Sequence, residues 1–264
     1  MQDAYSHQTA HASLAFLVPK VNLNGLTQWV NDYLVLNTNT VLDAFPLPWV
    51  DNILADCAQA TIWSALDMTN SFFQTLMNPD DIQKTAVTTP FGLYDVMPMG
   101  LCNSPPIHQH RVTTALRHLI RKICRVYVDD IIIWLKNITY HTCDIQLVLG
   151  VLCENGLYLN PKKCCFYHTE IDFLRHHISA RGIEANTSKV DKILHWPVLK
   201  SATDVCSFLG LVQYILMYLP NLAQHTCILM PLTTKATKTD FPVWTNSHQD
   251  AFQAIKSLSP RENI

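Results

Sequence analysis

The sequence has little glycine and little charge. Only seven of its 264 residues are glycine, and it contains neither of the glycine-rich patterns, GxGxxG and GxxxxGK[ST], that bind phosphate through backbone amides. Charged residues make up 15% of the chain, where about 25% is typical. Lysine and arginine (19) nearly balance aspartate and glutamate (21), so the formal net charge is −2. This balance argues against a basic coat protein of nucleic acid and against an acidic tail.

Zinc motifs, signal peptides and membrane spans are also missing. The nine cysteines form no CxxC pair, and the 12 histidines form no HExxH motif. We expect the cysteines to be reduced and to be buried as small apolar residues. The N-terminus lacks a basic stretch, and the apolar run Ile131–Leu135 is far too short to span a bilayer. These features predict an intracellular protein, cytoplasmic or nuclear, that is neither secreted nor bound to a membrane.

What the sequence does contain is a mixed pattern of strands and helices followed by helices alone. The predicted elements are a strand over 60–67, extended segments over 85–99, a helix over 104–122, a hairpin over 123–135, a helix over 142–155, a strand over Phe173–Ile178, and helices over 188–196, 201–219 and 245–258. This order predicts an α+β core with a helical unit appended to it.

Two Asp–Asp pairs stand in contrasting surroundings. Asp80–Asp81 follows a proline in a polar stretch, which is typical of a turn that begins a helix. Asp129–Asp130 instead interrupts an apolar run, Val126–Ile133, where charges are rare without a partner. A water-exposed hairpin turn is one interpretation of this second pair, and a functional site is the other.

A functional site needs a third acid, and Asp67 ends an apolar strand of its own. Adjacent strands could bring Asp67 beside Asp129, and clustered carboxylates favour a bound cation because they repel one another. Mg²⁺ suits such a cluster, and two such ions can support phosphoryl transfer. The residues alone allow a nucleotidyl-transfer site without singling it out.

A family resemblance narrows this choice. Tyr127-Val128-Asp129-Asp130 resembles the YxDD box of reverse transcriptases, and a series of neighbouring motifs over residues 12–258 resembles the gypsy class of LTR retrotransposons in the same order. The series consists of Asn31-Asp32-Tyr33 with Leu36-Asn37, Phe45-Pro46-Leu47-Pro48, Leu66-Asp67-Met68, Lys84-Thr85-Ala86, Thr89–Tyr94, Met97–Leu101 with Asn103, Pro161–Cys164, Phe173-Leu174 with His176–Ser179, Gly182-Ile183, Trp196-Pro197 and Phe208–Leu211.

The resemblance implies an RNA-directed DNA polymerase with the right-hand fold: fingers, a palm with a βαββαβ core, and a helical thumb. Its predicted divisions are fingers over 1–56 with 83–98, palm over the rest of 57–180, thumb or connection over 181–230, and the truncated start of an RNase-H-like domain over 231–264. RNase H activity is not expected, because the acidic motifs of that domain lie beyond residue 264. The remainder of the Pol polyprotein, RNase H and integrase, would be absent.

The resemblance also implies roles for individual residues. Asp67, Asp129 and Asp130 would be catalytic and would bind Mg²⁺, or Mn²⁺ in its place. The nucleotide-binding residues would be Phe72, Gln74, Met99, Gly100, Lys162 and Lys163, with Phe72 screening the sugar 2′ position. The primer grip would be Phe173, Leu174, Arg175, His176 and His177. The partners would be dNTPs and a template–primer of RNA or DNA; oligomeric state is not implied.

Three positions depart from the family pattern. Gln28 and Leu34 replace arginines, and Arg175 replaces a glycine in the primer-grip motif. If that glycine adopts a positive φ, arginine strains the backbone there. The alternatives are therefore an active reverse transcriptase and a catalytically impaired retrotransposon relic that at most binds template–primer. A cyclase-like or phosphodiesterase-like two-metal enzyme ranks below both, because it does not need the motifs over 20–48.

Overall fold

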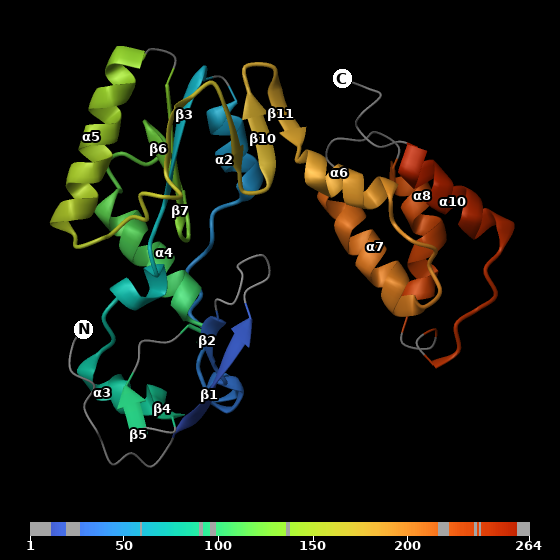
Figure 1. The fold of residues 1–264 in the computed structure, drawn as a ribbon, viewed down its shortest axis with the longest axis horizontal. Coiled ribbons are helices and arrows are strands. Elements are labelled where there is room, and N and C mark those ends of the chain that lie inside the picture. Colours follow the sequence, from blue (N-terminus) through green and yellow to red (C-terminus); the bar gives the residue numbers. More distant parts are fainter. Residues whose placement is uncertain are drawn as a thin grey trace. The chain divides into compact units, whose positions relative to one another are not determined.

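The computed structural model describes residues 12–19, 27–58, 60–89, 92–95, 99–135, 138–215, 222–234, 237 and 239–257. The chain divides into two compact units, Met1–Ile171 and Asp172–Ile264. Each unit is described by itself below, and Figure 1 labels many of the helices and strands of both.

A four-stranded sheet forms the centre of the first unit. Its order is β6-β7-β3-β8, in which β3 (Ile62–Asp67), β6 (Cys124–Tyr127), β7 (Asp130–Leu135) and β8 (Cys165–His168) pair antiparallel. The β-branched and aromatic residues of these segments favour strands, as the sequence predicts. The predicted strand over 60–67 and the predicted hairpin over 123–135 are both confirmed.

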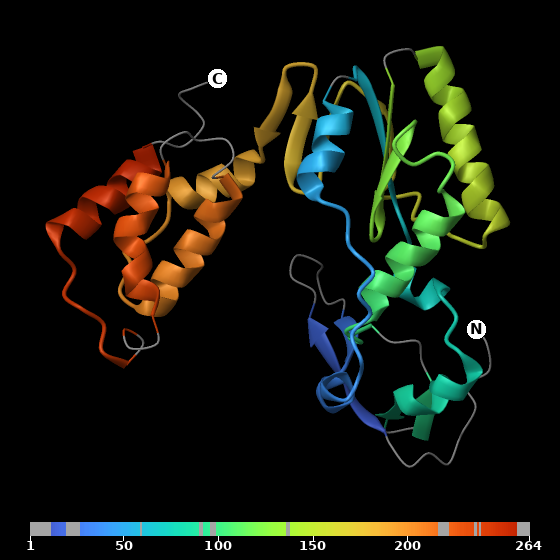
Figure 2. The same cartoon turned by 180° about the vertical axis from the view of Figure 1, so that it is seen from behind.

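Helices cover both faces of this sheet. On one face, Val112 of α4 (Ser104–Ala115) and Val148 of α5 (Ile138–Glu154) share an apolar core with Leu66, Ile131 and Ile133. On the other face lies α2 (Val50–Cys57): the Trp63 indole donates to the Cys57 carbonyl (3.1 Å), and Arg125 forms an ion pair with Asp56. Figure 2 shows α2 and α5 on opposite sides of the sheet, in agreement with these contacts.

A second four-stranded sheet, of order β2-β1-β4-β5, belongs to the same unit. It consists of β1 (Ser13–Pro19), β2 (Thr27–Asn31), β4 (Ala86–Thr89) and β5 (Gly92–Asp95). The first unit also contains short helical segments: α1 (Leu34–Thr38), η1 (Ser71–Gln74), α3 (Pro79–Ile82) and η2 (Gln83–Thr85). Buried Tyr33, which lies just before α1, connects the chain there to η2, because its hydroxyl donates to the Thr85 carbonyl (2.9 Å).

The second unit begins within a small sheet and continues as helices. The sheet has the order β11-β10-β9, from β9 (Glu170–Phe173), β10 (His176–Ser179) and β11 (Gly182–Ala185). The helices are α6 (Thr187–Leu194), α7 (Ala202–Ile215), α8 (Leu222–Leu229), η4 (Met230–Thr233) and α10 (Asn246–Ser257). Phe208, Phe252 and Ile255 are among the residues that form their common core. The helical unit that the sequence predicts is therefore present.

Three expectations need correction. The single strand predicted over Phe173–Ile178 is wrong, because Leu174 (φ 48°) and Arg175 (φ 72°) turn the chain between β9 and β10. The helix predicted over 104–122 ends at Ala115, since the chain turns through Arg121 (φ 69°) to enter β6. All nine cysteines are free as expected, but not all are buried: four, Cys143, Cys153, Cys206 and Cys227, are exposed.

Two simpler points complete the fold. Asp80 and Asp81 lie in the first turn of α3, where Asn78 caps the helix, so this Asp–Asp pair begins a helix as predicted. Across the described ranges of the chain, no helix is both long and apolar enough to cross a membrane.

Candidate active site

The register of the central sheet brings two acids together. In the antiparallel pair β3–β7, Asp67 lies directly opposite Asp130, and opposed residues in such a pair share one face of the sheet. Leu66 and Ile131 point into the core beneath α4 and α5, so the alternation of side chains places both aspartates on the other face. Asp129 occupies the turn beside them, and its carbonyl accepts a hydrogen bond from the Met68 amide (3.0 Å).

The turn that carries Asp129 is tight and strained. Only Val128 and Asp129 separate β6 from β7, and Val128 has φ 51°. A positive φ is unfavourable for a β-branched residue and costs on the order of 1–3 kcal/mol. Gln109 of α4, almost fully buried, holds this turn: its Oε1 accepts from the Val128 amide (2.6 Å), and its Nε2 donates to the Val126 carbonyl (3.4 Å).

Ser71 fixes the carboxylate of Asp129. Its hydroxyl, at the first position of η1, donates to Oδ1 of Asp129 (2.5 Å). Asn70, which precedes η1, has φ 44° in the left-handed region that asparagine tolerates. The segment that follows Asp67 therefore turns back sharply enough to reach the Asp129 side chain.

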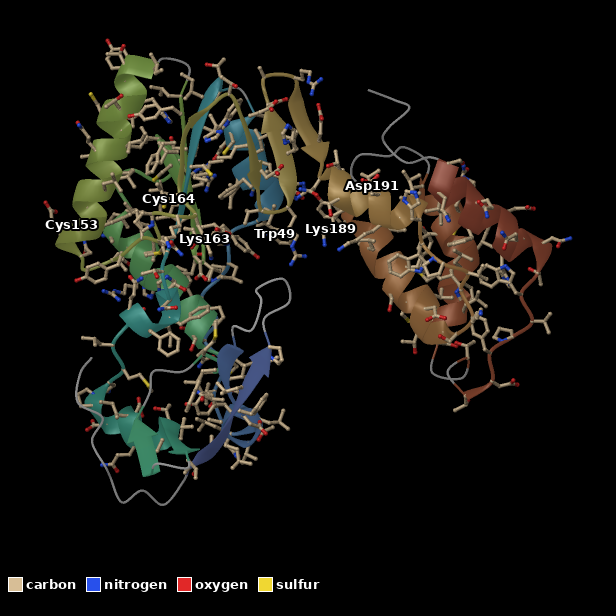
Figure 3. All side chains as sticks on the ribbon, in the orientation of Figure 1. Trp49, Cys153, Lys163, Cys164, Lys189 and Asp191 are labelled. Atoms are coloured by element: carbon tan, nitrogen blue, oxygen red, sulfur yellow. The ribbon has the colours of Figure 1, made fainter. Side chains whose placement is uncertain are left out.

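The electrostatics of the site favour a cation. Burial, followed by the negative charges of Asp67 and Asp129, raises the pKa of Asp130 to about 6, while Lys163 acts in the opposite direction. Oδ1 of Asp67 is buried and has no hydrogen-bond partner among the residues that the structure describes. Its Oδ2 lies 3.1 Å from Nζ of Lys163, whose side chain is largely exposed. Figure 3 labels Lys163 and the neighbouring Cys164 beside the sheet.

The three carboxylates fit a divalent metal by their chemistry. They are hard oxygen donors of the kind that Mg²⁺ prefers, and a bound cation would satisfy the unpartnered oxygen of Asp67 and offset the repulsion that raises the pKa of Asp130. Within the described residues, no three His, Cys, Asp or Glu side chains are arranged to hold an ion as they stand. Two of the carboxylates instead contact Lys163 and Ser71.

Gln74 is bound to the backbone of a neighbouring segment. Its Oε1 accepts from the Tyr158 amide (2.7 Å), and its Nε2 donates to the carbonyls of Tyr158 (2.9 Å) and Thr69. Arg111 of α4 extends this network, since its guanidinium donates to the carbonyls of Gln74 and Asn155. These bonds tie η1 to the chain that leads into Lys162 and Lys163.

The other predicted nucleotide residues lie around this framework. Phe72 is half-buried in η1, with its ring edge-on to His108 at 5.8 Å between centroids. The Lys162 side chain is exposed, and the Lys162 amide donates to Oδ1 of Asn160 (3.2 Å). Met99 is half-buried, and Gly100 has φ 113°. Of the two lysines, only Lys163 forms an ion pair with a predicted catalytic aspartate among the described contacts.

The comparisons with known proteins identify the family. The family model for reverse transcriptase (RNA-dependent DNA polymerase) matches residues 19–211. This match covers the whole β6-β7-β3-β8 sheet and all three aspartates. The chain belongs to the reverse transcriptase family.

Relatives of this reverse transcriptase chain include transposon polyproteins. It is 35% identical over 260 residues to the "Retrovirus-related Pol polyprotein from transposon 297" of Drosophila melanogaster, an alignment that covers 96% of this chain and 24% of the relative. The Tf2-3 transposon polyprotein of Schizosaccharomyces pombe is 29% identical over 248 residues, which cover 93% of this chain and 18% of the relative. The chain thus spans about a quarter or less of these relatives.

A solved structure has the same fold. The foamy viral protease–reverse transcriptase in complex with double-stranded DNA aligns with a TM-score of 0.86 at 24% identity, over 96% of this chain and 44% of that one. This likeness establishes the polymerase fold, an α+β architecture, for the present chain.

The residues predicted for the primer grip lie in the second unit. Phe173 is buried, and His176 is buried with its ring 5.1 Å from that of Tyr214. His177 pairs with Asp172 (3.0 Å). Leu174 and Arg175 form the turn, and the Tyr214 hydroxyl donates to the Arg175 carbonyl. The positive φ suspected at Arg175 is confirmed.

Sequence reasoning missed Ser71, Gln109 and Arg111, which support the site without any recognisable motif. Gln109 offers one signal in retrospect: it precedes Val112 and Leu116 at helical spacing, so it is a polar residue on the buried face of α4. Of the departures from the family pattern, Leu34 is exposed at the start of α1. The Gln28 side chain lies outside the described part of the structure.

Proposed function

We propose that this chain is the polymerase region of a gypsy-class retrotransposon Pol polyprotein, and that it extends a primer 3′-OH with dNTPs on an RNA or DNA template. The observation that carries this proposal is the register that opposes Asp67 and Asp130 beside Asp129, within a chain of the reverse transcriptase family. Pyrophosphate is the leaving group of this reaction.

The right-hand divisions follow from this function. We assign residues 1–56 with 83–98 to the fingers, the rest of 57–180 to the palm, and 181–230 to the thumb. Residues 231–264 would begin an RNase-H-like domain. The sheet β6-β7-β3-β8 with α4 and α5 supports the palm assignment, because Asp67 and Asp130 lie on the face opposite these two helices and Asp129 lies in the adjoining turn.

Asp67, Asp129 and Asp130 would hold Mg²⁺, or Mn²⁺ in its place. When bound, a pair of such ions supplies electrostatic stabilisation to the attacking and leaving oxygens of an in-line displacement. The three carboxylates contribute the negative donors, and Gln109 and Ser71 keep Asp129 in position for this purpose. Lys163, which pairs with Asp67, would contact the nucleotide triphosphate.

Phe72 and Gly100 would shape the sugar and base pocket. A bulky ring at Phe72 would clash with a ribose 2′-OH, and the edge-on contact with His108 limits the ring's movement. Gly100 permits a close approach because it has no side chain. Gln74 and Arg111 would act by holding η1 in place. Met99 and Lys162 are expected to contribute at the margins of this pocket.

Template–primer binding would depend on phosphate contacts and on duplex shape. We expect affinity to fall with rising salt, as it does when protein cations displace condensed counterions. We also expect little dependence on sequence, since A-form hybrids are recognised mostly by shape and backbone. The residues of the predicted primer grip, Phe173–His177, would contact the primer strand. The foamy viral enzyme, for its part, was solved with an RNA/DNA hybrid as well as with double-stranded DNA.

The test is primer extension by the full chain with dNTPs and Mg²⁺. Asp129→Asn removes a central carboxylate and should lower incorporation by about 10²–10³-fold, the usual loss when one electrostatic stabiliser is removed. Asp80→Asn is the matched control, because Asp80 also belongs to an Asp–Asp pair but lies exposed in α3. Absence of incorporation by the parent would favour the relic instead, and equal activity in all three proteins would contradict the role given to Asp129.

A further inference from the structure

Two asparagines far apart in the sequence each hold the segment that carries the other. Asn37, in α1, donates from Nδ2 to the Gly100 carbonyl (2.9 Å) and accepts at Oδ1 from the Cys102 amide (2.9 Å). Asn103 donates from Nδ2 to the Val41 carbonyl (2.8 Å) and accepts at Oδ1 from the Asp43 amide (3.0 Å). Each side-chain amide thus donates one hydrogen bond and accepts another, as a backbone peptide group does between two paired strands.

The role of Asn103 is tertiary and not local. It occupies the N-cap of α4, a position at which asparagine usually accepts a hydrogen bond from the first turn. Its side chain makes no cap hydrogen bond and instead holds residues 41–43. The cost of an uncapped helix end is about 1 kcal/mol. The Asn103 side chain therefore gives up a stabilising cap hydrogen bond in order to bind residues 41–43.

Gly100 lies between these contacts at a position where a side chain would be crowded. Its φ is +113°, and a Cβ added there would lie 3.1 Å from the Asn31 carbonyl oxygen. The Gly100 backbone therefore packs directly on the end of β2 while Asn37 holds its carbonyl. Buried Asn31 is itself fixed, because it accepts a hydrogen bond from the Trp29 indole at Oδ1.

We infer that Asn37 and Asn103 are positioning residues that act as one unit to fix the Gly100–Cys102 backbone, and thereby to preform the nucleotide pocket. The inference rests on the proposed function, in which Gly100 lines that pocket. If only a fraction of molecules holds this segment in place, the apparent affinity for nucleotide falls by that fraction. A loosened pair of asparagines should therefore raise KM for dNTP while kcat changes little.

Amide exchange tests the coupling without any activity measurement. Asn37→Ala removes the acceptor of the Cys102 amide, so exchange at Cys102 should quicken about tenfold or more. If the two asparagines act as one unit, exchange at Asp43 quickens as well, although Asn103 is intact. Asn39→Ala is the control, because the Asn39 side chain bonds only the Val35 carbonyl of its own helix among the described contacts. Unchanged exchange at Asp43 in Asn37→Ala would overturn the inference.

Kinetics test the consequence. Asn37→Asp keeps the size and the acceptor but places a carboxylate oxygen against the Gly100 carbonyl in place of the donor. We expect KM for dNTP to rise about tenfold, with kcat per folded enzyme within about threefold. Asn39→Asp adds the same charge two residues away and should leave both constants unchanged.

The outcomes separate this inference from the function on which it rests. No incorporation by the parent chain contradicts the proposed function. Two results would overturn the positioning role while the parent is active. In one, Asn37→Asp has the same KM as the parent; in the other, Asn37→Asp lowers only kcat, and does so in proportion to the fraction of unfolded protein. A raised KM in Asn37→Asp with normal constants in Asn39→Asp supports it.

Discussion

Two tight turns in this chain place side chains where glycine would be expected, and they are held in different ways. In the first unit, Val128 (φ 51°) is held by buried Gln109, which binds its amide. In the second unit, Leu174 (φ 48°) and Arg175 (φ 72°) turn at the surface, where the Tyr214 hydroxyl binds the Arg175 carbonyl.

The difference between the two turns lies in how firmly the strained backbone is held. The first turn carries Asp129, and its strain is locked in place by a buried polar partner that would be costly to remove. The second turn has an exposed side chain at Arg175 and no partner of that kind among the described contacts. Substitutions at the first turn should therefore be harmful, whereas relief of strain at the second should be beneficial.

The largest effect is expected for Gln109→Leu. It leaves the half-buried Val128 amide without its acceptor, which should lower the free energy of unfolding by about 1–3 kcal/mol. Urea denaturation followed by tryptophan fluorescence measures this change. Gln146→Leu on the exposed surface of α5 is the matched control, with an expected change within about 0.5 kcal/mol. Equal losses in the two variants would contradict the role given to Gln109.

A smaller effect of opposite sign is expected for Arg175→Gly. Glycine adopts φ 72° without steric cost, so stability should rise by about 0.5–1 kcal/mol, after the greater freedom of glycine in the unfolded chain is taken into account. Arg181→Gly makes the same exchange in the neighbouring turn, where φ is not positive, and should destabilise by about 0.5–1 kcal/mol. Thermal melting of both variants decides the matter: a loss in Arg175→Gly would refute the strain at this turn.

The smallest effect concerns pH and belongs to the first unit. Burial lowers the pKa of His141, whose Nε2 lies 2.8 Å from the Ser64 hydroxyl. The folded state therefore keeps His141 neutral while the unfolded chain takes up a proton below about pH 6.5. The stability contributed by this difference is present above pH 6.5 and is lost as pH falls towards the lowered pKa.

His141→Gln should make the free energy of unfolding less sensitive to pH between 7 and 5, because the variant has no imidazole to protonate. Glutamine does not titrate and can still bond to Ser64. Because the parent and the variant are compared at each pH, groups such as Asp130, whose raised pKa acts in the opposite direction, cancel. Parallel curves for the two proteins would show that His141 is not the group responsible.

The sequence was sufficient to predict the strands of the central sheet and the places of the acids at their ends, because these patterns are local. An apolar strand that ends at Asp67, and a hairpin pattern around Asp129–Asp130, are visible without a fold, and the observed register of β3 and β7 then pairs the acids. Ser71 and Gln109 were not predictable in this way, since each acts on a residue far along the chain and only the tertiary structure brings them there.

The error over Phe173–Ile178 has a similar cause. Phenylalanine and isoleucine favour a strand, and nothing in the pattern marks Leu174 and Arg175 as residues with positive φ. Only the family resemblance pointed to Arg175, because a glycine usually stands there. The prediction that the cysteines are buried was wrong for a different reason: whether a given small residue is buried depends on how its neighbours pack, which its residue type alone does not show.

The most direct test of the central claim is the restoration of incorporation by metal. The parent chain and Asp81→Asn are stripped with a chelator and supplied with template–primer, dNTPs and then Mg²⁺, beside Asp67→Asn. The assignment of Asp67, Asp129 and Asp130 predicts that Mg²⁺ restores incorporation in the parent and in Asp81→Asn, and that Asp67→Asn stays at least about a hundredfold lower. Full restoration in Asp67→Asn, or incorporation that survives the chelator, would contradict it.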